Sequence, residues 1–317
     1  MRSLWKTHAP LTAASLVLVA ALAAFAVGLL VDPRTIAGAP AWLKPAKFAA
    51  SIAIYGLTLV WMFQFLPGWP RTRAAVGWIT AIVGLLETAL VALQAWRGTT
   101  SHFNLGTPFD RTVFAVMGAA ILVQWTASLA LVAAVWRQPF PDRALGSALR
   151  AGLVLAILGA AMGGLMTRPT AEQVEAVHAT GRMIVSGAHT VGGPDGGRGL
   201  PGMMWSAEHG DLRVPHFLGL HALQVLPLIA VVLGLLGTRI SGGERLRLVR
   251  VAGFGYAAFM AILLWQALRG QSVAAPDGMT IVMLAIWAVS TAVAAVAPVG
   301  GRVLAVRTTS VLALRAQ

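Results

Sequence analysis

The distribution of apolar residues constrains this chain more than any other feature of its sequence. Eight apolar runs, separated by polar stretches, are each long enough to cross the hydrocarbon core of a bilayer, for which about 20 helical residues are needed. Backbone groups in hydrocarbon must form their hydrogen bonds within the segment, which favours helices. The expected spans cover residues 10–31, 47–66, 74–97, 112–136, 148–166, 216–237, 249–268 and 279–299.

Composition agrees with a membrane location. Of the 317 residues, 57% are hydrophobic and only 11% are charged, whereas about a quarter of the residues of a soluble chain are charged. We therefore predict an all-α, polytopic integral membrane protein with eight transmembrane helices. The first run follows two basic residues, as the core of a signal peptide does, but it is longer than such a core usually is. We count it as a span.

The positions of lysine and arginine predict the orientation. With the N-terminus inside, 14 of the 24 basic residues lie on the cytoplasmic side, and acidic residues outnumber the basic ones in the long outer loop. The positive-inside rule therefore favours two cytoplasmic termini in a cell membrane, which we expect to be a bacterial inner membrane. Orientation and contact with the lipid bilayer explain the formal charge of +13, so no nucleic-acid partner is implied.

The two halves of the chain resemble each other. An offset of 172 residues aligns the segment 94–98, QAWRG, with 266–270, QALRG, and Arg73 with Arg245, without a gap. This pattern predicts two four-helix repeats, 1–147 and 148–317. Because four is an even number of spans, the repeats would be parallel, related by an axis along the membrane normal. A chance match between two arginine-ended helices is the alternative.

The segment 167–215 is too long to be a simple connection. Thr170 and Gln173 have the spacing of a capping box, which predicts a short helix over Ala171–Ala179. The glycine-rich stretch 192–199 lacks the spacing of a phosphate-binding loop and predicts a flexible turn. Met203 and Met204 follow it, and they either pack at the membrane interface or supply soft ligands to copper.

Glu87 is the main polar anomaly, because it lies about ten residues from either end of its span. Ionised groups at that depth are costly and usually functional. Gln94 and Arg97 continue its face toward the outer surface, while Lys47 and Tyr55 lie on one face of the preceding helix. We predict that Glu87, Tyr55 and Lys47 are catalytic. The alternative is that Glu87 only holds helices together.

Four histidines gather toward the outer side and are candidate metal ligands. His216 and His221 are five residues apart and cannot chelate one ion from a regular helix, so a shared site needs a ligand from elsewhere. Because the chain has no cysteine, any metal site must use other donors. The candidate metal ligands are His102, His209, His216 and His221, and the candidate cofactor-binding residues are Arg97, Arg213, Arg269 and Gln94.

Three function classes remain open. The first is a redox protein that binds haem b or copper and acts on a quinol, with arginines at the haem propionates. The second is a proton-coupled or small-solute transporter, although Phe259 stands where the repeat would place a counterpart of Glu87. The third is a non-catalytic protein without cofactor that docks a partner. A serine hydrolase is disfavoured because no GxSxG motif is present.

Overall fold

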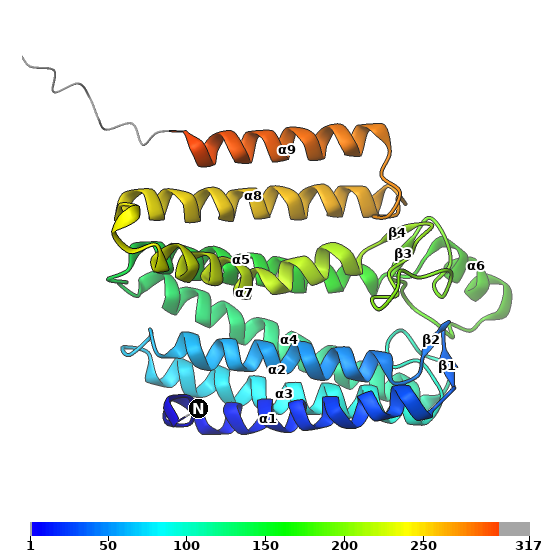
Figure 1. Cartoon of the computed structure of the whole chain (residues 1–317). Coiled ribbons are helices and arrows are strands. Elements are labelled where there is room, and N and C mark those ends of the chain that lie inside the picture. The colour runs from blue at the N-terminus through cyan, green and yellow to red at the C-terminus, as the bar shows by residue number, and fades with distance from the viewer. Residues whose placement is uncertain (1, 298–317) are drawn as a thin grey trace, which may run out of the picture.

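The computed structural model describes residues 2–297, and this part of the chain is a helical bundle with two short β-hairpins (Figure 1). The hairpins pair β1 (Thr35–Ile36) with β2 (Ala39–Pro40), and β3 (Thr190–Val191) with β4 (Gly210–Asp211). The helices are α1 (Arg2–Val31), α2 (Leu43–Phe63), α3 (Pro70–Trp96), α4 (Pro108–Arg137), α5 (Arg143–Met166), α6 (Ala171–Thr180), α7 (Arg213–Leu235), η1 (Gly237–Arg239), α8 (Gly242–Leu268) and α9 (Gly278–Val296).

Eight of these helices are long and apolar enough to cross a membrane, as the sequence predicted. Several begin earlier than the apolar runs. For example, α3 begins at Pro70 and α8 at Gly242. The predicted spans start later because the first turns of these helices carry arginines, which lie outside the apolar runs. Arginine side chains at helix ends can reach the polar interface, so these turns extend the spans.

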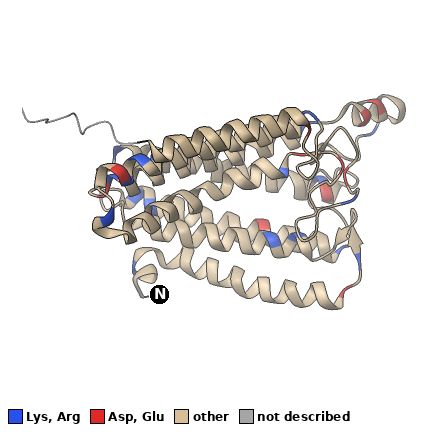
Figure 2. Cartoon of the chain, turned by 45° about the horizontal axis from the view of Figure 1, so that its top comes forward, with Lys and Arg blue, Asp and Glu red and all other residues tan. Residues whose placement is uncertain are grey.

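Successive spans run in opposite directions, so the connections gather at two ends of the bundle (Figure 1). We call the end formed by residues 32–42, 97–107, 167–212 and 269–277 the long-loop end. We call the end formed by residues 64–69, 138–142 and 236–241 the short-turn end. The first and last described residues both lie at the short-turn end. Charged residues lie mainly at these two ends (Figure 2).

The same packing occurs in both halves of the described chain. Helix α1 packs on α2 and α3, and α5 packs on α7 and α8 in the same way. The offset of 172 residues also separates the ends of α2 and α7, at Phe63 and Leu235, and both ends of α3 and α8. A glycine with positive φ follows the end of α3 and of α8, Gly98 at 75° and Gly270 at 74°, which is typical of a helix C-terminus.

Loops at the long-loop end are held together by backbone hydrogen bonds. The predicted short helix is confirmed as α6, with a capping box between Thr170 and Gln173. Beyond it, the chain pairs with the α3–α4 loop, since the amide of Ser186 donates to the carbonyl of Phe103 at 2.9 Å. The amide of Leu212 donates to the carbonyl of His189 at 2.9 Å. These bonds bring three separate loop segments to the start of α7.

Candidate functional site

Glu87 lies near the middle of α3 and is only 1% exposed. Neither carboxylate oxygen has a hydrogen-bond partner within residues 2–297. Helix α2 approaches α3 closely here, because Gly84 leaves space for the side chain of Ile52. The charged group that acts on Glu87 through space is the ammonium of Lys44. An ionised carboxylate at this depth costs at least about 2.5 kcal/mol, and no hydrogen bond from a described residue offsets that cost.

Two lysines stand in the first turns of α2, at the long-loop end. The ammonium of Lys44 makes no hydrogen bond or ion pair with any described residue, but it interacts electrostatically with Glu87 and His102. The ammonium of Lys47 donates to the carbonyl of Met203 at 2.5 Å. Lys44 lies outside the span 47–66 that the apolar pattern predicts, and sequence reasoning missed it.

Three half-buried histidines at the long-loop end each have Nδ1 engaged by a different group. In the described part of the chain, Nε2 of these rings makes no hydrogen bond. The partners of Nδ1 are the Ser101 hydroxyl at 3.0 Å for His102, the Asp195 carboxylate at 2.9 Å for His189 and the Gly159 carbonyl at 2.7 Å for His216. Each ring is therefore held in one orientation, with Nε2 available for proton exchange.

The histidines of the loops favour the neutral form. Burial lowers the pKa of His102 well below its usual value, and the positive charge of Lys44 lowers it further. Burial also lowers the pKa of His189, although its hydrogen bond to Asp195 opposes the shift. Burial disfavours the Asp195 carboxylate, but hydrogen bonds from His189 hold the pKa of that carboxyl well below its usual range. Near neutral pH, Asp195 is therefore ionised beside a neutral imidazole.

The other two predicted metal ligands lie elsewhere. His209 packs against Gly193 in the long loop, and the ring of His221 lies 4.3 Å from the ring of Phe217, centre to centre. Within residues 2–297, no group of three or more histidine, aspartate or glutamate side chains is arranged to hold a metal ion. His189, which sequence reasoning missed, contributes to the cluster because the loop folds back onto α7.

The arginines proposed for a cofactor are paired with aspartates. Arg97 bonds to Asp110, which also accepts a hydrogen bond from Gln94 at 2.8 Å. The Arg213–Asp211 and Arg269–Asp277 pairs span 2.6 and 2.5 Å. Since Asp110 is buried and begins α4, its network with Gln94 and Arg97 fixes the α3–α4 connection. These contacts engage all four residues with other groups of the described chain.

Tyr55, which was predicted to be catalytic, contacts α4. The Tyr55 hydroxyl interacts with Gln124 and Ser128 of α4. One turn further toward the short-turn end, the Thr58 hydroxyl accepts a hydrogen bond from Gln224 of α7 at 3.2 Å. These contacts link the two halves of the bundle through α2, α4 and α7.

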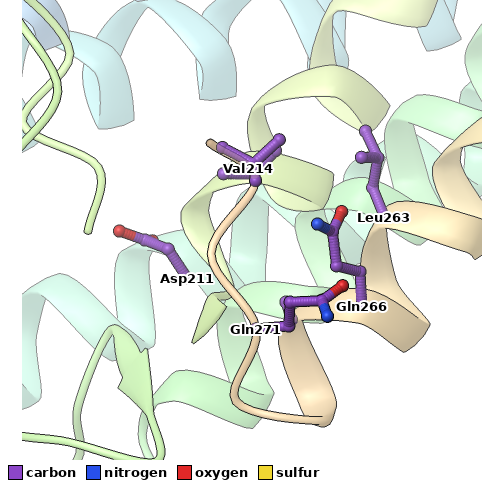
Figure 3. Close-up of a pocket in the computed structure, with 7 residues that line it drawn as sticks. Asp211, Val214, Leu263, Gln266 and Gln271 are labelled. Carbon is purple, nitrogen blue, oxygen red and sulfur yellow. The ribbon is translucent and has the colours of Figure 1, made fainter. Parts of the chain in front are cut away.

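A small pocket at the long-loop end lies between α7, α8 and the segment that follows α8 (Figure 3). The amide groups of Gln266 and Gln271 lie beside each other in it. Gln266 donates to the carbonyl of Ser272 at 2.9 Å, and Gln271 accepts from Thr280 at 2.7 Å. Because its polar groups are already paired, we place the candidate site around Glu87 rather than here.

The second half has no counterpart of the buried acid. Phe259, which stands 172 residues after Glu87, stacks on Trp287 of α9 with ring centres 4.7 Å apart.

We define the candidate site as Glu87 and the ionisable groups that are linked to it directly or through one another. These groups are Lys44, Lys47, His102, His189, Asp195, Arg213 and His216. Comparison of the chain with protein-family models, with curated proteins and with solved structures gave no match.

Proposed function

We propose that this protein is a proton-coupled membrane transporter in which Glu87 takes up and releases the coupling proton. The observation that carries the proposal is the buried Glu87 carboxyl, whose two oxygens lack a hydrogen-bond partner among the described residues. A carboxyl in such surroundings changes its charge at a large energetic cost, so its protonation is strongly coupled to the arrangement of nearby charges.

The route for the proton begins at the long-loop end. His102, His189 and His216 interact with one another electrostatically, and His102 and His189 both interact with Lys44. Neutral imidazoles accept and donate protons near neutral pH. A proton from solution passes through this group and binds one oxygen of Glu87, which converts the carboxylate to the neutral acid.

The continuation toward the short-turn end follows buried polar groups on helices of both halves. Atoms without a hydrogen-bond partner in the described chain include the Thr80 hydroxyl and the carbonyl oxygens of the Gln124 and Gln224 side chains. These residues belong to α3, α4 and α7. Polar atoms at membrane depth typically line solute or proton pathways, and interfaces between transporter repeats are where binding sites occur.

We also infer how the two halves of the chain are related and how the protein is oriented in the membrane. The halves 1–147 and 148–317 are parallel four-helix repeats, supported by the matching bounds of α3 and α8. The long-loop end faces outward and both termini are cytoplasmic in a bacterial inner membrane, supported by the charge count. Superposition of residues 44–98 on 216–270 tests the repeat, since unrelated helix pairs would not overlay.

Infrared difference spectroscopy of the purified protein in lipid nanodiscs tests the role of Glu87. The C=O stretch of a protonated carboxylic acid should appear on acidification and should be absent in Glu87→Gln, which keeps the shape of the side chain. Glu172→Gln on α6, where the side chain is exposed, is the matched control and should retain the band. A spectrum of Glu87→Gln identical to that of the unmodified protein would reject the proposal.

A metal or haem centre is the second candidate function. It is favoured by the three imidazoles whose Nδ1 atoms are engaged, because metal-binding histidines usually have the second nitrogen held in this way. The site would bind copper or haem b and exchange electrons with a quinol. Metal analysis and the visible spectrum of the purified protein decide it: stoichiometric copper or a Soret band supports this function, and their absence rejects it.

A further inference from the structure

We propose that a groove between α8 and α9 binds one acyl chain of an anionic phospholipid, whose headgroup lies against Arg247 and Arg250 at the short-turn end. This site shares no residue with the candidate site around Glu87, so it is independent of the proposed function. Three observations carry it: the groove itself, the exposed position of α9 in the bundle, and the arginines at one end of the groove.

The groove is a hollow of about 570 Å³ between α8 and α9. Eleven residues of these two helices line it, and none of them is charged. Only Ser290 and Thr291 carry a hydroxyl, and the Ser290 hydroxyl already donates to the Trp287 carbonyl at 3.1 Å. Mainly apolar walls and volumes of about 300–1,000 Å³ are usual for small-molecule sites. The groove therefore fits an apolar ligand better than a polar solute.

The length of the groove matches one leaflet of a bilayer. Along α8 the lining covers residues 251–262, about 16 Å at 1.5 Å per residue. This is close to half of the ~30 Å hydrocarbon core, the depth that the acyl chain of one leaflet occupies. Gly255 belongs to this lining, and a Cβ atom there would lie 3.0 Å from Cγ2 of Thr291. A larger residue at this position would therefore narrow the groove.

Helix α9 lies at the edge of the bundle, beyond α8 (Figure 1). It packs on α8, and Thr280 is the only buried residue among 278–296. Two side chains that line the groove are largely exposed, Phe254 of α8 at 78% and Ile286 of α9 at 63%. In a membrane, such apolar side chains face lipid tails. The groove is thus open to the hydrocarbon core, from which an acyl chain can enter it.

Arginines lie at the short-turn end of the groove. Arg247 and Arg250 stand one turn before Val251 and Phe254, the first lining residues of α8. The guanidinium of Arg247 donates to two carbonyls of α9, those of Ala294 and Ala295. These partners are neutral, so they leave its positive charge in place. Arg250 is exposed, where it can reach a headgroup at the membrane interface.

Acidic residues do not cancel the positive charge of this segment. Residues 236–250 contain four arginines and one acid, Glu244, and Asp142 pairs with Arg245 at 2.8 Å. Even if Asp142 and Glu244 each neutralise one arginine, two positive charges remain beside the groove. Basic residues near the membrane surface attract anionic lipids, and guanidinium groups form strong hydrogen bonds with phosphate. The groove and its arginines therefore favour a phospholipid with net negative charge.

Native mass spectrometry of the full chain in detergent tests the site, by titration with phosphatidylglycerol and with phosphatidylcholine of the same acyl chains. One phosphatidylglycerol molecule should bind saturably and more tightly than phosphatidylcholine. Ala258→Phe, which fills the groove, should weaken binding of both lipids about tenfold or more, as expected when a few CH₂ groups are excluded. Ala292→Phe is the matched control, because Ala292 of α9 is exposed and lies outside the lining.

A second pair of variants tests the headgroup contact. Arg250→Gln should weaken binding of phosphatidylglycerol about fivefold, the usual effect of one basic residue near an anionic surface. Binding of phosphatidylcholine should not change, because its headgroup has no net charge. Arg71→Gln is the control, since Arg71 is an exposed arginine near the start of α3, at the same end of the bundle.

Binding without saturation, equal affinity for the two lipids, or unchanged binding in Ala258→Phe would reject the site. Lipid-free dimers that Ala258→Phe converts to monomers would reject it too, because a second copy would then occupy the groove. Thermal unfolding gives an independent measure, since a ligand of the folded state stabilises it. Phosphatidylglycerol should raise the melting temperature of the unmodified protein and of Ala292→Phe, but not of Ala258→Phe. Failure here leaves the infrared test of Glu87 unaffected.

Discussion

At the scale of single residues, the candidate site is a set of ionisable groups held out of water. Glu87 is buried without a hydrogen-bond partner among the described residues, while the loop histidines are half-buried with one nitrogen bonded. When the pKa of a group differs between the folded and the unfolded protein, the free energy of unfolding depends on pH. His102 is the clearest case, because burial and the charge of Lys44 act on it in the same direction.

We expect the protein to lose thermal stability as the pH falls below about 6.5, the usual histidine pKa. The folded pKa of His102 is lowered, so below that pH the unfolded chain binds a proton that the native protein resists. The stabilisation is complete above this pH and is lost on acidification. Melting temperatures in nanodiscs across the pH range measure it.

Two variants make the stability test specific. His102→Gln should flatten the pH dependence, while His178→Gln on the exposed α6 should leave it unchanged. His189 and His216 act on His102 electrostatically and titrate as well, so a remaining slope in His102→Gln is expected from these histidines. Equal slopes in His102→Gln and the unmodified protein would mean that His102 is not held neutral.

At the scale of elements, the contact between α5 and α7 holds the second half together and positions one histidine of the site. A Cβ atom on Gly159 would lie 2.6 Å from Cα of Gly219, so these helices touch through their backbones. This closeness lets the Nδ1–H of His216 donate to the Gly159 carbonyl at 2.7 Å. Small residues at helix contacts are a common means of association in membranes.

Gly159→Leu should force α5 and α7 apart and destabilise the protein by about 1–3 kcal/mol, the usual cost of overpacking. The backbone of Gly219 cannot move aside as a side chain could. Gly164→Leu, in the same helix but with nothing within 4 Å of its Cβ position, is the control for the effect of leucine itself. Thermal unfolding of both variants in one detergent measures the difference. Equal melting temperatures would contradict the observed helix contact.

At the scale of the whole molecule, eight antiparallel spans place the loops of the candidate site at one end of the bundle (Figure 1). Basic residues of the short turns gather at the other end (Figure 2). The positive-inside rule predicts that this second end faces the cytoplasm. In the proposed orientation, the loops of the candidate site lie outside, where a solute and a proton could enter together.

The absence of cysteine allows a direct test of this topology, because single cysteines can be introduced into an unreactive chain. A membrane-impermeant maleimide added to intact cells should label cysteines at Gly106 and Gly197, at the long-loop end. It should not label cysteines at Gly68 and Gly237, at the short-turn end. Reporter fusions after Thr238 should read cytoplasmic, as should fusions after Arg302, which lies outside the described residues. The reverse labelling would invert the orientation.

The sequence by itself determined the helical class, the eight spans and α6, because these depend on local signals: apolar length, the positions of arginines and a capping box. It also singled out Glu87, since a carboxyl within an apolar run is visible without any knowledge of contacts. Tertiary structure decided which residues surround Glu87. Lys44 stood outside the predicted span and His189 lay in a glycine-rich loop, so neither had a periodic signal. The proximity of Lys44 to Glu87 and of His189 to Lys44 comes from helix packing and loop pairing across long sequence separations, which no local pattern encodes.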